Sequence, residues 1–232
     1  MIYHKLAEIY DELVEDKEAS LCWAKFVNNS TSGKKVLELA CGSGEITIAL
    51  ADLGFDVLAT DKSKYMIDKA YDKSADRNIR YRIMDMLNWK INELFDVVIC
   101  FCDSINYLSD FEQLRYVFRK AYQCLESKGV LLFDMHHEHR LLEFKDEWDE
   151  DGVIRDISYQ WLINSEYDQI VQYFNIIEDN KVYQEIHVQR VFEVDKVVDL
   201  LKECGFSVEV LNDYDIFNEE LKERYFFKAT KA

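Results

Sequence analysis

The sequence predicts an α/β protein in which a doubly wound, mostly parallel seven-stranded sheet carries an antiparallel β insertion after its fifth strand. Three observations predict this fold. Short apolar segments alternate with helical segments five times between residues 35 and 135, the pattern becomes strand-like after residue 140, and helical periodicity resumes near residue 194. Near-continuous apolar strands that alternate with helices are typical of a parallel sheet covered on both faces.

The elements of the core follow one another in a regular order. The first thirty residues have helical periodicity, with Leu6, Ile9 and Leu13 on one face. Strands are expected at 35–40, 55–60, 95–101 and 130–135, an extended segment at 79–84, and helices at 45–53, 64–73 and 111–125. Gly54 and Gly129 stand where the chain leaves one element for the next.

The region after residue 140 has a different pattern. Alternating segments at 154–161, 170–177 and 182–192 predict three antiparallel strands, with a hairpin turn at 178–181. A helix at 194–204 and two edge strands at 206–210 and 224–229 then complete the core. We therefore expect a core of residues 1–139 and 193–232, with residues 1–30 as a helical lid, and an insertion of residues 140–192 as a second lid.

Composition limits the possible partners. The formal net charge is −17, so a grip on nucleic acid, which needs several Lys or Arg at phosphates, is not expected. No apolar run reaches the ~20 residues of a membrane span, and the N-terminus is acidic rather than signal-like. The six cysteines form no CxxC pair. These features predict a cytoplasmic protein with reduced thiols, as a monomer or homodimer.

A glycine-containing loop between the first strand and its helix provides the first site signal. Such a loop lets a ligand approach the backbone, and Asp61 ends the next strand about twenty residues later, where a carboxylate can bind ribose hydroxyls. A dinucleotide site would need a third small residue where Thr47 stands, and Glu38 inside the strand is not a dinucleotide feature. A nicotinamide oxidoreductase is therefore disfavoured.

At these residues the chain resembles the class I S-adenosylmethionine-dependent methyltransferases, which have a Rossmann-like fold. The first motif stands as Glu38-Leu-Ala-Cys-Gly-Ser-Gly44, and further motifs follow in order at Asp61, Asp85-Met86, 95–102 and 129–134. The resemblance implies that Asp61 binds the ribose, that Lys62 and Met66 flank the adenine, and that Asp85 meets its amino group. The implied cofactor-binding residues are Tyr10, Trp23, Glu38, Ala40, Cys41, Gly42, Gly44, Asp61, Lys62, Met66, Asp85, Met86, Phe101 and Cys102.

The N-terminal segment 6–13 and the strand-rich insertion look like those of small-molecule methyltransferases that include amino-sugar N-methyltransferases. In that group a helix Tyr closes over the methyl end of the cofactor, which implies this role for Tyr10. Beyond the fourth strand this chain has Tyr107 where the group often has His, so a His-based proton acceptor is not implied there. Aromatic faces favour a cationic sulfonium; Trp23 and Phe101 fit a core position at least as well.

The run from Asp134 to His139 does not predict a metal site, because adjacent side chains on an extended segment point apart. His136 is instead a candidate pocket residue and general base, beside Tyr10 and Tyr107 as catalytic candidates. We predict in-line methyl transfer to a small-molecule acceptor. Base- and glutamine-directed members carry a Pro-Pro motif after the fourth strand, and this chain has no proline. A protein or tRNA methyltransferase of another kind, or a non-catalytic cofactor-binding module, stays open.

Overall fold

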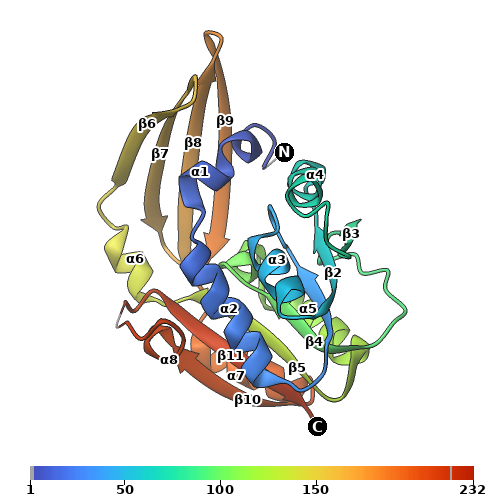
Figure 1. Ribbon diagram of the computed structural model, residues 1–232. Helices are drawn as coiled ribbons and strands as arrows, with labels where there is room; N and C mark the ends of the chain where they lie inside the picture. Colours follow the sequence, from blue (N-terminus) through green and yellow to red (C-terminus); the bar gives the residue numbers. More distant parts are fainter. Residues whose placement is uncertain (1–2, 220) are drawn as a thin grey trace.

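The computed structural model describes residues 3–219 and 221–232, and within these residues it contains two β-sheets (Figure 1). The larger sheet has seven strands in the order β10-β11-β5-β4-β1-β2-β3. Its parallel strands are β1 (Lys35–Leu39), β2 (Asp56–Asp61), β3 (Arg80–Ile83), β4 (Phe95–Cys100) and β5 (Leu125–His136). The last two strands, β10 (Phe206–Asn212) and β11 (Arg224–Lys231), pair antiparallel at one edge. The predicted seven-stranded, mostly parallel sheet is therefore confirmed.

Helices cover both faces of this sheet. The helical elements around it are α2 (Lys17–Ser30), α3 (Glu45–Asp52), α4 (Lys64–Lys73), η2 (Ser104–Tyr107), α5 (Phe111–Cys124), α7 (Val194–Glu203) and α8 (Asp213–Phe217). Adjacent residues of β1 enter opposite clusters: Leu37 belongs to the cluster that contains side chains of α5 and α7, and Val36 to the cluster that contains side chains of α2 and α3. This alternation is the doubly wound arrangement, because side chains of a strand point to opposite faces in turn.

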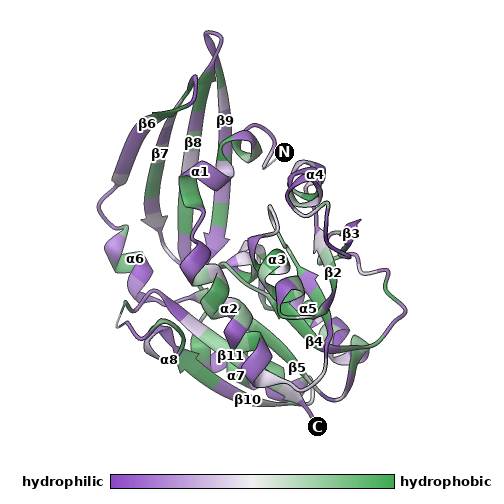
Figure 2. Cartoon of the chain, in the orientation of Figure 1, coloured by the Kyte–Doolittle hydropathy of each residue, from purple (hydrophilic) through white to green (hydrophobic). Residues whose placement is uncertain are grey.

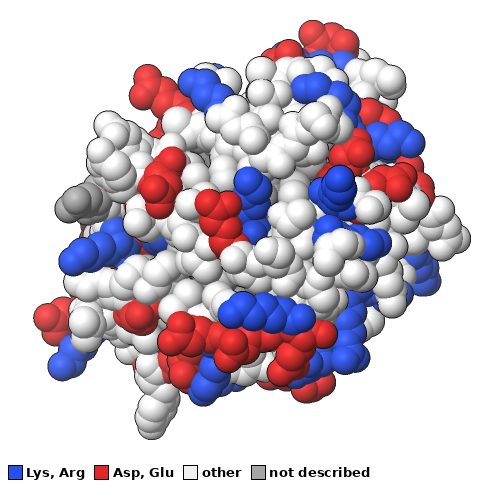
Figure 3. All heavy atoms as spheres, turned by 90° about the horizontal axis from the view of Figure 1, so that it is seen from below, with Lys and Arg blue, Asp and Glu red and all other residues white. Residues whose placement is uncertain are grey.

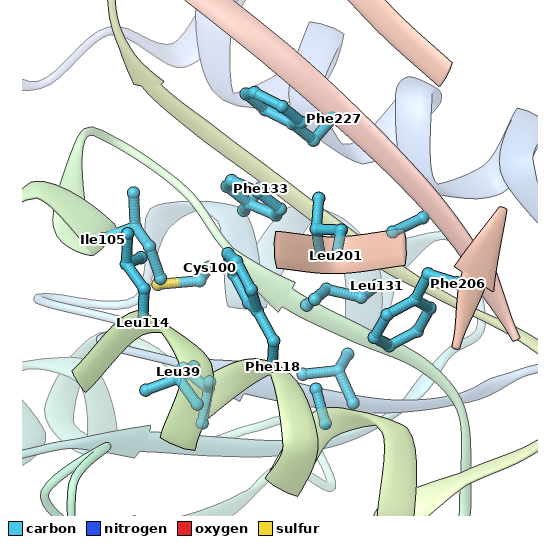
Figure 4. Close-up of a cluster of buried hydrophobic side chains, with 14 of the residues drawn as sticks. Leu39, Cys100, Ile105, Leu114, Phe118, Leu131, Phe133, Leu201, Phe206 and Phe227 are labelled. Carbon is cyan, nitrogen blue, oxygen red and sulfur yellow. The ribbon is translucent and has the colours of Figure 1, made fainter. Parts of the chain in front are cut away.

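The core on the α5 side consists of interlocking aliphatic and aromatic side chains (Figure 4). Phe133 of β5 stacks on Phe227 of β11 with ring centroids 4.5 Å apart, and Phe118 of α5 contacts Phe133 from the helix layer. Colouring by hydropathy shows the same layering, with the central strands largely apolar and the helices striped (Figure 2). Burial of these rings is a main source of stability, since each is worth about 1.5–3 kcal/mol when removed from water.

The second sheet is antiparallel and has the order β6-β7-β8-β9. Its strands are β6 (Trp148–Ile154), β7 (Ile157–Glu166), β8 (Gln169–Glu178) and β9 (Lys181–Arg190), and α6 (His139–Glu143) precedes them. The hairpin turn predicted at 178–181 is confirmed, with Asp179 and Asn180 both at positive φ. The expected number of three strands is wrong. The missed strand, β6, is an exposed edge whose three acidic residues conceal its alternation.

The N-terminal segment lies against this second sheet. It forms η1 (Leu6–Glu8) and α1 (Tyr10–Val14), and Leu6 and Ile9 share a buried cluster with Phe174 and Ile176 of β8. Figure 1 shows α1 and β6–β9 together at the upper end of the molecule, above the large sheet. Seen from below, the opposite face carries acidic and basic side chains next to one another (Figure 3). No helix among the described residues is long and apolar enough to cross a membrane.

Candidate functional site

A cavity of about 640 Å³ lies at the carboxyl ends of the parallel strands, beneath the N-terminal segment. Ligands of open α/β sheets collect at this edge. The cavity is lined by fourteen of the residues singled out from the sequence: Tyr10, Trp23, Glu38, Ala40, Cys41, Gly42, Asp61, Lys62, Met66, Asp85, Met86, Phe101, Cys102 and Tyr107. Gly44 and His136 are not among the lining residues.

The loop after β1 places its backbone against the cavity. Ala40 and Gly42 have φ of 53° and 54°, and a Cβ added to Gly42 would meet no heavy atom within 4 Å, so this part of the loop is open. Gly44 differs, because its Cβ would lie 2.9 Å from the Cβ of Ala70. Gly44 has a φ of 87°, and its lack of a side chain leaves room for Ala70 of α4. Its contact with the cofactor stays a prediction.

Asp61 and Asp85 stand at the ends of β2 and β3. Asp61 accepts the N–H of Gly42 at 3.0 Å and of Ser63 at 2.7 Å, and burial raises the pKa of its carboxyl group. Burial acts in the same direction on Asp85, but the ion pair with Lys62 at 2.8 Å and the Leu87 N–H hold the pKa of Asp85 below its usual range. Asp85 is therefore a carboxylate at neutral pH and can accept hydrogen bonds.

Glu38 is buried inside β1. Burial raises the pKa of Glu38 to about 8, so its carboxyl group is mostly protonated at neutral pH. The Thr47 hydroxyl is 2.5 Å from Glu38 Oε2. Glu38 and Thr47, whose presence in the sequence disfavours a dinucleotide site, are thus hydrogen-bonded to each other. Their contact joins the strand to α3 directly beneath the loop.

Aromatic side chains form one end of the cavity. Tyr3 and Tyr10 meet edge to face, and the Tyr3 hydroxyl is 2.8 Å from that of Tyr107. Burial raises the pKa of all three phenols, so each is neutral. Trp23 and Phe101 line the cavity while their rings pack 4.5 Å apart in the core, so the core interpretation of these two residues agrees with their burial. Sequence reasoning missed Tyr3 as a site residue, because no motif surrounds it.

A charged cluster lies beyond Cys102, which adopts a left-handed backbone conformation together with Asp103. The Arg224 guanidinium contacts both Asp103 oxygens at 3.1 Å, and its Nε is 3.2 Å from Asp134 Oδ2. Burial opposes ionisation of Asp103, yet Arg224 holds its pKa well below the usual range. Burial and the charge of Asp103 raise the pKa of Asp134. Arg224 lines the cavity and was missed, because it lies at the far end of the chain.

His136 is buried behind this cluster instead of lining the cavity. Its Nε2 is 3.2 Å from Gln189 Oε1, and its Nδ1 is 3.5 Å from Asp103 Oδ1. Burial lowers the pKa of His136, which favours the neutral imidazole. The expectation that His136 lines the pocket is therefore wrong: β5 continues to this residue and directs it between the two sheets.

Ion pairs connect α1 to α3 and α4. Asp11 lies 3.2 Å from Lys69 and 3.3 Å from Lys73 of α4, and Lys73 also pairs with Glu45 at the start of α3. Asp11 and Glu45 both line the cavity. The sequence signal for this contact is the spacing of Lys69 and Lys73, which places both on one face of a helix.

Comparisons with known proteins agree with this geometry. A family model described as a methyltransferase domain matches residues 36–129. The Bacillus subtilis (strain 168) protein described as "Putative methyltransferase YqeM" is 34% identical over 248 residues, which cover 100% of this chain and 98% of that protein. A crystal structure of an S-adenosylmethionine-dependent methyltransferase from Clostridium acetobutylicum ATCC 824 matches with a TM-score of 0.81 and 26% identity over the full length of both chains. The chain belongs to the S-adenosylmethionine-dependent methyltransferases.

The fold of this methyltransferase is shared more widely. The sugar N-methyltransferase KedS8 from Streptoalloteichus has a TM-score of 0.78 at 20% identity, and the match covers 94% of this chain and 88% of KedS8. At this identity the likeness concerns the fold alone. The second sheet and the N-terminal helices are therefore part of an architecture that other methyltransferases also have.

Proposed function

We propose that this methyltransferase acts on a small-molecule acceptor that enters the cavity beneath α1. The observation that carries the proposal is the cavity itself. Its volume of about 640 Å³ is within the range of roughly 300–1,000 Å³ that small-molecule sites have. The N-terminal segment and β6–β9, which we propose as the two lids, stand over the same end of the sheet, where a large acceptor would meet them.

S-adenosylmethionine supplies a methyl group on a positively charged sulfur. The residues of the cavity fit this molecule. A carboxylate has about four lone-pair sites, and Asp61 uses two of them for backbone N–H groups, so acceptor capacity is left for ribose hydroxyls. We assign Asp85 to the adenine amino group, with Lys62, Met66 and Met86 around the ring. The open backbone from Ala40 to Gly42 and the neutral Glu38 would border the remainder of the cofactor.

The acceptor end would contain Tyr3, Tyr10 and Tyr107, with Phe101 and Cys102 beside it. Methyl transfer is an in-line displacement, so catalysis depends mainly on alignment at ~3–3.5 Å and on the exclusion of water. Neutral aromatic faces stabilise a nearby cation without competing for the acceptor. The Tyr10 ring lies on the lid, and we propose that it closes the methyl end when the lid is seated.

A transfer assay tests this proposal. Purified protein is incubated with radiolabelled S-adenosylmethionine and a cell extract that has been divided by dialysis into small and large molecules. Label in the dialysable fraction supports a small-molecule acceptor. Label that appears only in precipitated protein or RNA would overturn the proposal and favour a macromolecular acceptor. Glycine, sarcosine and a nucleotide-linked amino sugar are then offered as pure acceptors, because amines are the simplest nucleophiles for this transfer.

Two variants make the assay specific. Asp61→Ala should lose most of the transfer, whereas Asp56→Asn changes an exposed carboxylate at the other end of the same strand and should keep it. We also propose a cytoplasmic location, since all six cysteines are free thiols and such thiols persist in reducing compartments.

A further inference from the structure

A hydrogen-bonded chain leads from the cavity into the second sheet. The Tyr3 hydroxyl is 2.8 Å from the Tyr107 hydroxyl, which is 2.7 Å from Nδ1 of His187 on β9. His187 Nε2 in turn lies 3.7 Å from Glu185 Oε2. Tyr3 and Tyr107 line the cavity, whereas His187 is 1% exposed and Glu185 is 6% exposed. Nothing in the established methyltransferase activity assigns a task to the two buried residues.

The contacts of Glu185 determine which atoms of this hydrogen-bonded chain donate and which accept. Its Oε1 accepts the N–H groups of His4, Lys5 and Leu6 at 2.7–3.0 Å, so Glu185 is held as an acceptor. Its Oε2 and His187 Nε2 face each other at 3.7 Å, and both are buried without a hydrogen-bond partner among the residues that the structure describes. The imidazole proton therefore belongs on Nε2, toward the carboxylate.

The tautomer decides how each hydroxyl is oriented. With its proton on Nε2, His187 has a bare Nδ1 that accepts the Tyr107 O–H. The Tyr107 oxygen then accepts the Tyr3 O–H, which leaves lone pairs of the Tyr3 and Tyr107 oxygens free on the cavity side. The hydrogen bonds are thus oriented so that a proton can pass from the cavity to His187.

We propose that His187, oriented by Glu185, takes up the proton that the acceptor releases, through Tyr107. This inference rests on the proposed small-molecule function and names the proton path of the same site. A bond forms between the acceptor atom and the methyl carbon, and the carbon–sulfur bond breaks with its electron pair on sulfur. The acceptor loses its proton to the Tyr107 oxygen, directly or through Tyr3, while the Tyr107 proton moves to His187 Nδ1. The imidazolium is stabilised by the Glu185 carboxylate.

Other groups at the cavity are less suited to this task. The tyrosines are neutral and their buried phenolates are unfavourable, so they can relay a proton but not hold a negative charge. Glu38 already carries a proton at neutral pH. The groups that face His187 are Tyr3, Tyr107 and Glu185, with the Phe174 ring of β8 closing another side. The charged member of this set is the Glu185 carboxylate, 3.7 Å from His187 Nε2.

The tautomer can be measured without an acceptor. Nitrogen-15 NMR of histidine-labelled full-length protein, saturated with S-adenosylhomocysteine, should show His187 with its proton on Nε2 at neutral pH. Tyr107→Phe should shift the Nδ1 resonance because it loses its donor, and Glu185→Gln should shift Nε2. A proton found on Nδ1 would overturn the proposal, since the chain would then run in the opposite direction.

Kinetics give the second readout, with the dialysable extract fraction as acceptor source. Since His187 acts through Tyr107, it is a positioning residue, and His187→Gln should lower the rate at saturating S-adenosylmethionine by about a hundredfold, as expected for loss of a proton acceptor. The apparent KM for S-adenosylmethionine and the Kd of S-adenosylhomocysteine should stay within about twofold. Tyr107→Phe should cause a similar loss, and the double variant should lose little more, because the two act as one unit.

The controls separate this inference from the proposed function. His139→Gln changes an exposed histidine outside the cavity and should keep the parent rate. An unchanged rate in His187→Gln, with an active parent, would refute the proton path alone. A parent that transfers no methyl to small molecules would refute the proposed function, while the NMR tautomer still decides the orientation of His187. If His187→Gln does not fold, the rate of Glu185→Gln and the spectrum of the parent protein decide between the two outcomes.

Discussion

At the scale of single residues, two buried carboxyl groups border the cavity and have different tasks. Glu38 is held by one hydroxyl inside β1, and burial makes it a neutral acid. Asp61 is held by two backbone N–H groups, which stabilise its charged form against the effect of burial. A neutral Glu38 leaves the loop free of repulsion between the two groups. The pH dependence of stability tests the state of Glu38, and substitution tests the role of Asp61.

The first prediction concerns stability as a function of pH. The pKa of Glu38 in the folded chain is about 8, whereas an unfolded Glu titrates near about 4.3. Between these values the unfolded state binds fewer protons, so this group makes stability fall as pH rises, by up to about 1.4 kcal/mol per pH unit. Glu38→Gln should lack that fall. Urea unfolding from about pH 5 to about pH 8 measures it.

The decisive quantity is the difference in the free energy of unfolding between the parent and Glu38→Gln. From about pH 5 to about pH 8 the variant should become more stable relative to the parent, and above about pH 8 the difference should be constant. Glu12→Gln is the control, because Glu12 is exposed and its ion pair with Arg155 lies at the surface. A difference that does not depend on pH would mean that Glu38 is ionised in the folded protein.

The second prediction concerns Asp61. Asp61→Ala should weaken S-adenosylhomocysteine binding tenfold to a hundredfold, because a hydrogen bond to a charged group is worth about 1.5–3 kcal/mol. Asp61→Asn keeps one side-chain oxygen and should lose less. Titration calorimetry measures both, with Asp56→Asn as the control on the same strand. Affinity of Asp61→Ala within twofold of the parent would show that Asp61 is not the ribose ligand.

The local sequence pattern identified site residues in and after the strands. It did not identify residues of the site that come from distant parts of the chain. Glu38, Asp61 and Asp85 were found because they follow one another in a recognisable order: Glu38 lies inside β1, Asp61 ends β2 and Asp85 follows β3. The hydroxyl of Tyr3 meets that of Tyr107, 104 residues away, and Arg224 meets Asp103 across 121 residues. Neither contact leaves a trace in local sequence, because it depends on how the sheets and lids come together.

At the scale of elements, α1 is too short to be stable alone. Its position comes from contacts at both ends: Asp11 binds Lys69 and Lys73 of α4, and Arg155 reaches Glu12 from the second sheet. The Lys73 pair with Glu45 connects the same cation to the start of α3. Charge therefore joins α1 to α3 and α4 at the cavity.

The third prediction tests this connection. Asp11→Asn should weaken the attachment of α1 by about 1 kcal/mol, the upper range for a partly exposed ion pair. Amide hydrogen exchange in residues 4–16 should become about five times faster, while exchange in β1 and β4 stays unchanged. Glu18→Gln, which changes an exposed carboxylate in the first turn of α2, is the control. Equal exchange in the parent and Asp11→Asn would mean that apolar packing alone holds α1.

Element boundaries show where sequence patterns are informative. The five parallel strands were expected within a few residues of their positions, apart from the earlier start of β5. Four of them contain apolar runs between turn residues, whereas β3 is partly exposed and was expected only as an extended segment. The edge strand β6 and the five-residue helices α6 and α8 were not expected. Such elements have few apolar residues to give a period, and their structure comes from neighbours: β6 from pairing with β7, and α8 from a capping box at Asn212.

At the scale of the whole molecule, two segments more than a hundred residues apart pack against each other. Ile9 of the N-terminal segment is fully buried in a cluster with Ile157, Phe174 and Ile176 of the second sheet. Glu185 of β9 adds a polar contact, since it accepts three N–H groups of residues 4–6. The carboxylate that orients His187 thus also holds the start of the chain. Lid closure and the proposed proton path are therefore linked through one side chain.

The last prediction follows from this shared cluster. Ile9→Ala should cost about 2–4 kcal/mol by leaving a cavity between the two lid segments. If the segments form one roof, amide exchange should become faster both in residues 4–16 and in β8 and β9, while β1, β4 and β5 stay protected. S-adenosylhomocysteine should slow exchange in both segments together. Leu21→Ala removes a half-exposed leucine of α2 and should change neither. Faster exchange confined to residues 4–16 would show that the second sheet is stable without the N-terminal segment, and the acceptor would then meet two independent lids.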